Sequence, residues 1–191
     1  MDLQNILVTN IFSPETESKE SMYEVSSVSE IMDPPPVKVS LLVEEKQKNY
    51  SKLLENGACY GILKIKDLQV PIYEGDPFNA EELQKLTDQE ESCVLFQVFV
   101  GTKVIADHNN QGFDILKTLH IGDKIIIQEK DQTLSYVVKK VDLNGSNDGT
   151  IFYSNGDNAY YDWEMEESLN LYTCNEDWKH ITIVHCVLSN S

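Results

Sequence analysis

A single cysteine near the end of the chain occupies a place where a strand would present a reactive thiol. It closes the alternating run Leu169-Asn170-Leu171-Tyr172-Thr173-Cys174, which predicts a strand with the thiol at its end. Lys179 and His180 precede a second apolar strand, and His108 ends an earlier one. A cysteine, an imidazole and a cation are the components of a thiolate-based acyl-transfer site. The chain contains no arginine, so any cation in this site is of another residue type.

The length and composition of the chain fit one domain with an appendage. It has 191 residues, and 41% of them are hydrophobic, which is enough for a core. Its formal charge of −17 repels polyanions, which argues against nucleic acid as a partner. No run reaches the roughly 18 apolar residues of a membrane span, and no basic segment precedes an apolar run as in a signal peptide. We therefore expect a soluble chain without a membrane anchor of its own.

The four cysteines do not have the regular spacing of a disulfide scaffold. They are Cys59, Cys93, Cys174 and Cys186. Buried free thiols are the simplest interpretation, and a bridge between Cys59 and Cys93 stays open. Zinc is disfavoured although His180, His185 and Cys186 follow Cys174 closely. His185 and Cys186 point to opposite faces of a strand, and the chain has no Cys-x-x-Cys pair.

The chain divides into an extension and a main domain. Residues 1–43 predict an acidic, poorly ordered extension, because Pro34-Pro35-Pro36 cannot continue a helix. Within residues 44–191, helical spacing predicts a helix over 43–55 that ends at Asn56-Gly57. Further patterns predict strands at 59–65, 70–73, 92–100, 102–106, 123–128, 134–141, 169–173 and 181–188, short helices at 79–86 and 113–119, and a long loop over 144–167. Many short antiparallel strands with few helices indicate a mainly β fold, a closed or nearly closed barrel.

Four motifs in a fixed order resemble the sortase family of bacterial cysteine transpeptidases. The motifs are Gly61-Ile62-Leu63-Lys64-Ile65 with Val70-Pro71-Ile72-Tyr73-Glu74-Gly75, Val104-Ile105-Ala106-Asp107-His108-Asn109, Gly122-Asp123-Lys124-Ile125-Ile126-Ile127, and Leu169 to Cys174. They resemble the opening strands of the family, its catalytic-histidine strand, its "G-D-x-I-x-I" strand and its "L-x-L-x-T-C" motif. The resemblance covers residues 44–188 and implies an eight-stranded sortase-type β-barrel. The long loop before the cysteine strand makes class B the most similar class.

The resemblance implies a specific chemistry. Cys174 is the expected nucleophile, and His108 is expected to stabilise its thiolate and then protonate the leaving amine. The implied substrate is a Leu-Pro-x-Thr-Gly-like sorting signal of a surface protein. Its acyl group would pass through a thioester to an amine such as a peptidoglycan precursor or a pilin lysine, in cell-wall anchoring or pilus assembly. The implied location is the extracellular face of the bacterial membrane.

Two residues depart from the family pattern. The family has an arginine at the start of the last strand, where it holds the substrate carbonyls and the developing oxyanion. Alignment places His180 at that position, and Lys179 beside it is the second candidate. Histidine has fewer donors and loses its charge near neutral pH. Asp107 stands where the family usually has glycine, although on a regular strand its side chain points away from His108. A catalytically degenerate sortase-fold peptide-binding module therefore stays open as the alternative function.

The loop before the cysteine strand offers two further sites. Asn144, Ser146 and Asp148 match part of a calcium-binding loop, but Asn155 stands where that loop needs a glutamate, so a hairpin tip is the favoured interpretation and no cofactor is expected. In the family this loop forms one wall of the substrate groove. Tyr160, Tyr161 and Trp163, with Thr173 beside the cysteine, are the expected groove residues; the alternative is that the rings pack the loop onto the barrel. His120, His185 and Cys186 are interpreted as structural.

Overall fold

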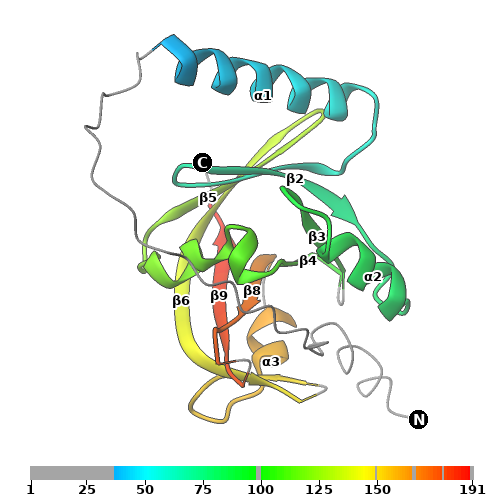
Figure 1. Cartoon of the computed structure of the whole chain (residues 1–191). Helices are drawn as coiled ribbons and strands as arrows, with labels where there is room; N and C mark the ends of the chain where they lie inside the picture. Colours follow the sequence, from blue (N-terminus) through cyan, green and yellow to red (C-terminus); the bar gives the residue numbers. More distant parts are fainter. Residues whose placement is uncertain (1–36, 98–99, 149, 165–166, 178, 190–191) are drawn as a thin grey trace, which may run out of the picture.

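The structure is a computed structural model that describes residues 37–97, 100–148, 150–164, 167–177 and 179–189 (Figure 1). Most of the expected extension, residues 1–36, lies outside the described residues. The first helix, α1 (Val37–Glu55), begins earlier than the expected residue 43. The sequence interpretation treated the three prolines as a helix breaker, but proline is well tolerated at the start of a helix.

The described residues form nine strands, and eight of them close into a barrel. The elements after α1 are β1 (Gly61–Ile65), β2 (Leu68–Glu74), α2 (Ala80–Thr87), β3 (Cys93–Phe96), β4 (Thr102–Ala106), η2 (Asn109–Gln111), η3 (Phe113–Thr118), β5 (Lys124–Glu129), β6 (Thr133–Asn147), β7 (Ile151–Phe152), α3 (Ala159–Glu164), β8 (Ser168–Cys174) and β9 (Ile181–Leu188). The strand order is β5-β1-β2-β3-β4-β8-β9-β6-β7, and pairing of β5 with β6 closes the ring. The expected mainly β, eight-stranded barrel is confirmed.

Two of the strand pairs are parallel, which corrects the expectation of an antiparallel barrel. β2 and β3 run parallel, with α2 as the connection between them. β4 and β8 also run parallel although more than 60 residues separate them along the chain, from Thr102 paired with Ser168 to Ala106 paired with Tyr172. Sequence patterns locate strands but do not choose partners for strands so far apart. The second parallel pair builds the site described below.

The sheet buries side chains on both faces. One cluster fills the barrel and includes Leu63, Ile105, Phe113, Leu171 and Cys186. The other covers the outer face of β3, β4, β8 and β9, where Trp163 of α3 and Leu83 of α2 close over the strands. Alternation along a strand therefore sends one side chain inward and the next into the outer cluster.

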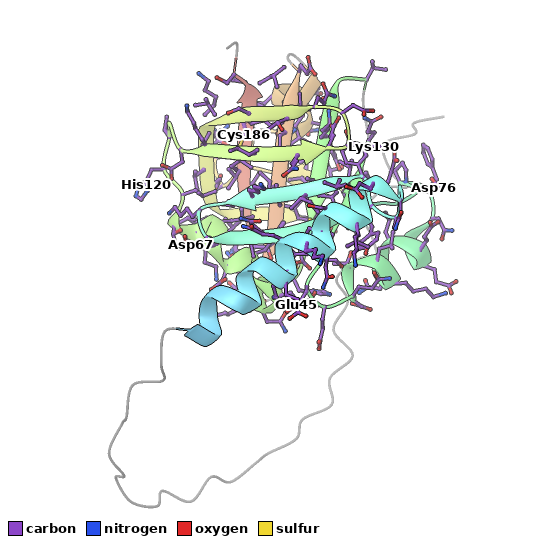
Figure 2. The ribbon with its side chains drawn as sticks, turned by 90° about the horizontal axis from the view of Figure 1, so that it is seen from above. Glu45, Asp67, Asp76, His120, Lys130 and Cys186 are labelled. Atoms are coloured by element: carbon purple, nitrogen blue, oxygen red, sulfur yellow. The ribbon has the colours of Figure 1, made fainter. Side chains whose placement is uncertain are left out.

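The helix α1 lies against the β1–β2 hairpin. The Tyr50 hydroxyl donates to the Gln69 carbonyl oxygen at 3.0 Å. Figure 2 shows α1, marked by Glu45, crossing this hairpin, whose turn is marked by Asp67. In the described part of the chain, no helix combines the length and apolar character that crossing a membrane requires.

The segment expected as one long loop over 144–167 contains regular structure. The strand β6 continues through Asn147 and pairs with β7, so the expected hairpin is confirmed, and α3 follows. Gly145 makes this possible: a Cβ there would lie 3.1 Å from Cγ1 of Ile183 and 2.9 Å from the Phe152 carbonyl oxygen. The sequence patterns did not predict these strands, because the segment is polar and β7 pairs with β6 across a tight turn.

Candidate active site

The parallel pairing of β4 and β8 brings His108 beside Cys174. The register ends at Ala106 and Tyr172; Cys174 lies two residues further along β8, and His108 lies two residues beyond the end of β4. The strand ends are tied together, because the Thr173 hydroxyl donates to the Asp107 carbonyl oxygen at 2.7 Å. His108 keeps extended backbone angles, φ −69° and ψ 143°. Alternation then places both side chains on the outer face, the face of Ala106 and Tyr172.

Cys174 is a buried thiol in apolar surroundings. Only 6% of the residue is exposed, and it packs in the outer cluster with Tyr172 and Ile181. Burial raises the pKa of the Cys174 thiol to about 12, because the thiolate loses its hydration there. At neutral pH the resting residue is therefore a thiol, and attack on a carbonyl requires a base that removes its proton.

His108 is the base nearest in the register, and its ring is held by a carboxylate. Its Nε2 lies 2.9 Å from Oδ1 of Asp88, and the side chain is 16% exposed. Asp88 is the residue that ends α2. Gln84 Nε2, one turn earlier, donates to the same Oδ1 at 2.8 Å. Sequence reasoning missed Asp88, because 20 residues separate it from His108 and no motif marks it.

Asp107 contacts the backbone of His108, with its side chain on the face opposite the His108 ring. Its Oδ1 accepts the backbone N–H of His108 at 2.7 Å. The side chain is directed toward the interior cluster, on the face of Ile105, so it points away from the His108 ring as expected. Burial raises the pKa of Asp107 to about 8. Its Oδ2 is buried without a hydrogen-bond partner in the described part of the structure.

The turn between β8 and β9 holds His180 away from Cys174. The backbone N–H of Asn175 donates to the His180 carbonyl oxygen at 2.8 Å, which extends the ladder by one pair on the face opposite Cys174. The His180 ring Nδ1 lies 2.5 Å from Oδ2 of Asp177, and this pairing lowers the pKa of Asp177 to about 2. Asp177 Oδ1 also accepts the backbone N–H groups of Lys179 and His180, both at 3.0 Å. These backbone donors are therefore engaged within the turn.

Ile181, the first residue of the last strand, is directly opposite Cys174. The two are paired across β8 and β9, and both belong to the outer cluster. Ile181 is 4% exposed. Lys179 is exposed and lies in the turn before this strand. The residue paired with Cys174 on the last strand is therefore apolar, and both Lys179 and His180 lie in the turn before that strand.

The residues expected in a substrate groove differ in exposure. Trp163 is fully buried and Tyr160 is 7% exposed, and their rings meet edge to face with centroids 5.1 Å apart. Burial raises the pKa of Tyr160 to about 12. Tyr161 is 66% exposed, and Thr173 is buried against the end of β4. The two buried rings pack α3 onto the sheet, which leaves Tyr161 as the ring that a peptide can reach.

The remaining polar candidates lie in structural positions. Asn144 and Ser146 belong to β6, and Asp148 follows its end, where its backbone N–H donates to the Thr150 carbonyl oxygen at 3.3 Å. Among the described residues, no three His, Cys, Asp or Glu side chains are grouped so that they could hold a metal ion. His185 Nδ1 lies 2.7 Å from Oδ1 of Asn170, and His120 lies in the exposed turn before β5. All four cysteines are free.

Comparison with known proteins gives one family. The family profile described as Sortase domain matches residues 62–189. No curated protein sequence matches the chain. Among solved structures, sortase E1 from Streptomyces coelicolor with a tripeptide in the active site is similar at a TM-score of 0.51 and 16% identity, over 69% of this chain and 88% of that chain. A sortase D5 transpeptidase from Clostridium perfringens is similar at 0.50 and 20%, over 77% and 89%, and the pilus-related sortase C of Group B Streptococcus at 0.51 and 21%, over 73% and 71%. The expected resemblance to class B stays a prediction.

Proposed function

Since this chain belongs to the sortase family, we propose that it is a cysteine transpeptidase in which Cys174 is the nucleophile and His108 the general acid and base. The observation that supports the proposal is the parallel β4–β8 pairing, because Cys174 and His108 each lie two residues beyond its last pair, Ala106 and Tyr172. The proposed substrate is a Leu-Pro-x-Thr-Gly-like sorting signal, by analogy with the family. The proposed location is the outer face of a bacterial membrane, where such signals and their amine acceptors meet.

The reaction follows from the buried state of the thiol. His108 removes the proton of Cys174 as the sulfur attacks the carbonyl carbon of the Thr–Gly bond. The same proton then goes to the leaving amine, which departs as the thioester forms. An amine acceptor attacks the thioester and gives up one proton to His108, the new amide forms, and the Cys174 sulfur leaves and takes that proton. Because the pKa of Cys174 is raised, proton transfer accompanies attack rather than preceding it.

Lys179 is the proposed replacement for the missing arginine. Its exposed side chain lies two residues before Ile181, the strand partner of Cys174, whereas the His180 ring pairs with Asp177. An ammonium group supplies charge to an oxyanion but not the paired donors of a guanidinium. Loss of one oxyanion donor typically costs about a hundred- to thousandfold in rate. We therefore propose a slow enzyme.

One observation favours the alternative, a peptide-binding module without turnover. Ile181 places a hydrocarbon side chain opposite Cys174, where it cannot stabilise an oxyanion. In this second proposal the barrel and the exposed Tyr161 bind a peptide, and Cys174 is a packing residue of the outer cluster.

A peptide library with an amine acceptor distinguishes the two proposals. The full chain is incubated with Leu-Pro-x-Thr-Gly-like peptides and triglycine, and the products are identified by mass spectrometry. The transpeptidase proposal predicts slow cleavage of the Thr–Gly bond and transfer of the N-terminal fragment to triglycine. Both should be abolished in Cys174→Ala and kept in Cys59→Ala. Peptide binding with no cleavage at any pH between 6 and 9 would instead support the module.

A further inference from the structure

We propose that Asp88 is the positioning residue of this site: it holds the imidazole of His108 so that the ring serves Cys174. The inference rests on the proposed function of Cys174 and His108. Its basis is the contact of 2.9 Å between His108 Nε2 and Asp88 Oδ1. The resulting order of groups is thiol, imidazole and carboxylate, contributed by β8, the end of β4 and α2.

The contact assigns different roles to the two ring nitrogens. A carboxylate accepts hydrogen bonds, so Nε2 facing Asp88 carries the proton in the neutral ring. Proton exchange with Cys174 then falls to Nδ1, which is the nitrogen that accepts. A base oriented by a third group in this way is the general form of a nucleophile–base–carboxylate arrangement. When His108 takes the thiol proton, the adjacent carboxylate stabilises the imidazolium.

The helix α2 holds Asp88 in place by several means. Asn79 caps its start, with Oδ1 accepting the backbone N–H of Glu82 at 3.1 Å. Leu83 is fully buried in the outer cluster and anchors the helix on the sheet. At its end, the backbone N–H of Asp88 donates to the Gln84 carbonyl oxygen at 2.9 Å. The carbonyl end of the helix also carries partial negative charge, which adds to the attraction for an imidazolium.

The contact between Asp88 and His108 bears on the missing arginine of this chain. The guanidinium of the family stabilises charge at the site, and the residue opposite Cys174 here is Ile181. The buried thiol also gives up its proton reluctantly. A carboxylate beside the imidazole orients His108 as a base, which assists removal of the thiol proton but does not stabilise the oxyanion.

The test is the pH dependence of alkylation at Cys174, which needs no peptide substrate. The full chain is treated with iodoacetamide from pH 5 to 9, and the peptide that contains Cys174 is quantified by mass spectrometry, so that any reaction of the half-buried Cys59 is counted separately. We expect Asp88→Asn to slow alkylation at pH 7 about tenfold. The acidic limb of the profile should move by about 0.5 pH unit toward lower pH, because the imidazolium loses a neighbouring charge. Asp88→Glu should restore most of the rate.

Two controls separate this inference from general effects. Glu90→Gln removes an exposed carboxylate two residues further on and should leave both rate and limb unchanged. Thermal unfolding checks that Asp88→Asn stays folded, and a structural defect would not move the limb. A wild-type profile in Asp88→Asn, or an equal shift in Glu90→Gln, overturns the inference. If His108→Ala also alkylates like the wild type, the Cys174–His108 pair itself is wrong; slow alkylation in His108→Ala with a wild-type Asp88→Asn refutes only the role of Asp88.

Discussion

Burial of Cys174 disfavours the thiolate that a nucleophile needs. Its outer-cluster neighbours exclude water, which strengthens hydrogen bonds to a bound peptide but disfavours the thiolate. A resting thiol paired with an oriented imidazole reconciles the two, because charge appears only as the reaction proceeds. In the proposed reaction, we therefore expect the missing oxyanion donor rather than the nucleophile to limit the rate.

Arginine at residue 181 should restore what the chain lacks. Ile181→Arg places a guanidinium opposite Cys174, whereas His180→Arg directs it to the face of Asp177. We expect Ile181→Arg to raise the rate of peptide cleavage by about 10- to 100-fold, part of the value of an oxyanion donor. Steady-state kinetics of the two variants, with urea unfolding as a check on the fold, makes the comparison. A gain in His180→Arg alone would show that the register argument is wrong.

Asp107 should make stability depend on pH. Its pKa is raised from 3.8 to about 8 in the folded chain, so the folded state binds more protons than the unfolded state between these values. The contribution of Asp107 to the free energy of unfolding is then largest below about pH 4 and is lost as pH rises toward 8. Asp107→Asn keeps an acceptor for His108 N–H and removes this titration.

The free energy of unfolding in urea, measured from pH 5 to pH 8, checks the prediction for Asp107. We expect the fall in stability over this range to be smaller in Asp107→Asn by about 2 to 5 kcal/mol. The exposed Asp114→Asn is the matched control and should follow the wild type. Identical slopes for wild type and Asp107→Asn would contradict a raised pKa of the buried Asp107 carboxyl.

Motif spacing predicts the proposed reacting residues but not the residues that lie next to them. Cys174 and His108 end apolar strands, which the sequence displays directly. Asp88 and Ile181 depend on which strands and helices pack together, and no local pattern contains that information. The expectation for His180 followed linear alignment, whereas the facing of a side chain depends on register, in which one residue reverses the face.

At the scale of elements, Asp88 lies at the end of α2, and this helix packs closely on the sheet. A Cβ at Gly75 would lie 2.5 Å from Leu83 Cδ2 and 3.2 Å from Val94 Cγ2, so the helix packs directly on the end of β2. The sequence predicted α2 from its cap and its spacing, and the structure confirms it as Ala80–Thr87. Its role as the crossover between parallel strands was not evident, because the strands on either side were expected to be antiparallel.

Leu83→Ala should loosen this helix. The side chain is fully buried, so its truncation should cost about 2 to 5 kcal/mol of stability, from lost burial and the cavity left behind. Urea unfolding measures the cost, and Cys174 alkylation under folding conditions measures the effect on the site. Lys85→Ala, which removes only an exposed ion pair with Glu81, is the control and should unfold close to the wild type. A stable Leu83→Ala would show that α2 is held by other contacts.

At the scale of the whole molecule, one sheet has two buried faces. The inner face makes the barrel, which alternating strands predicted correctly. The outer face of four strands is covered by α2, α3 and the hairpin of β6 and β7, and the active site lies at its edge. The sequence interpretation placed residues 144–167 in a loop, because polar residues and a tight turn mask structure that only packing onto that face stabilises.

The thioester at Cys174 is the most direct test of the account. The full chain is mixed with a cleavable Leu-Pro-x-Thr-Gly-like peptide without an amine acceptor, quenched in acid, and mapped by mass spectrometry. We predict an adduct of the N-terminal peptide fragment on Cys174, lost on treatment with hydroxylamine and absent in Cys174→Ala. Cleavage that continues in Cys174→Ala, or an adduct on another residue, would contradict the proposal that Cys174 is the nucleophile.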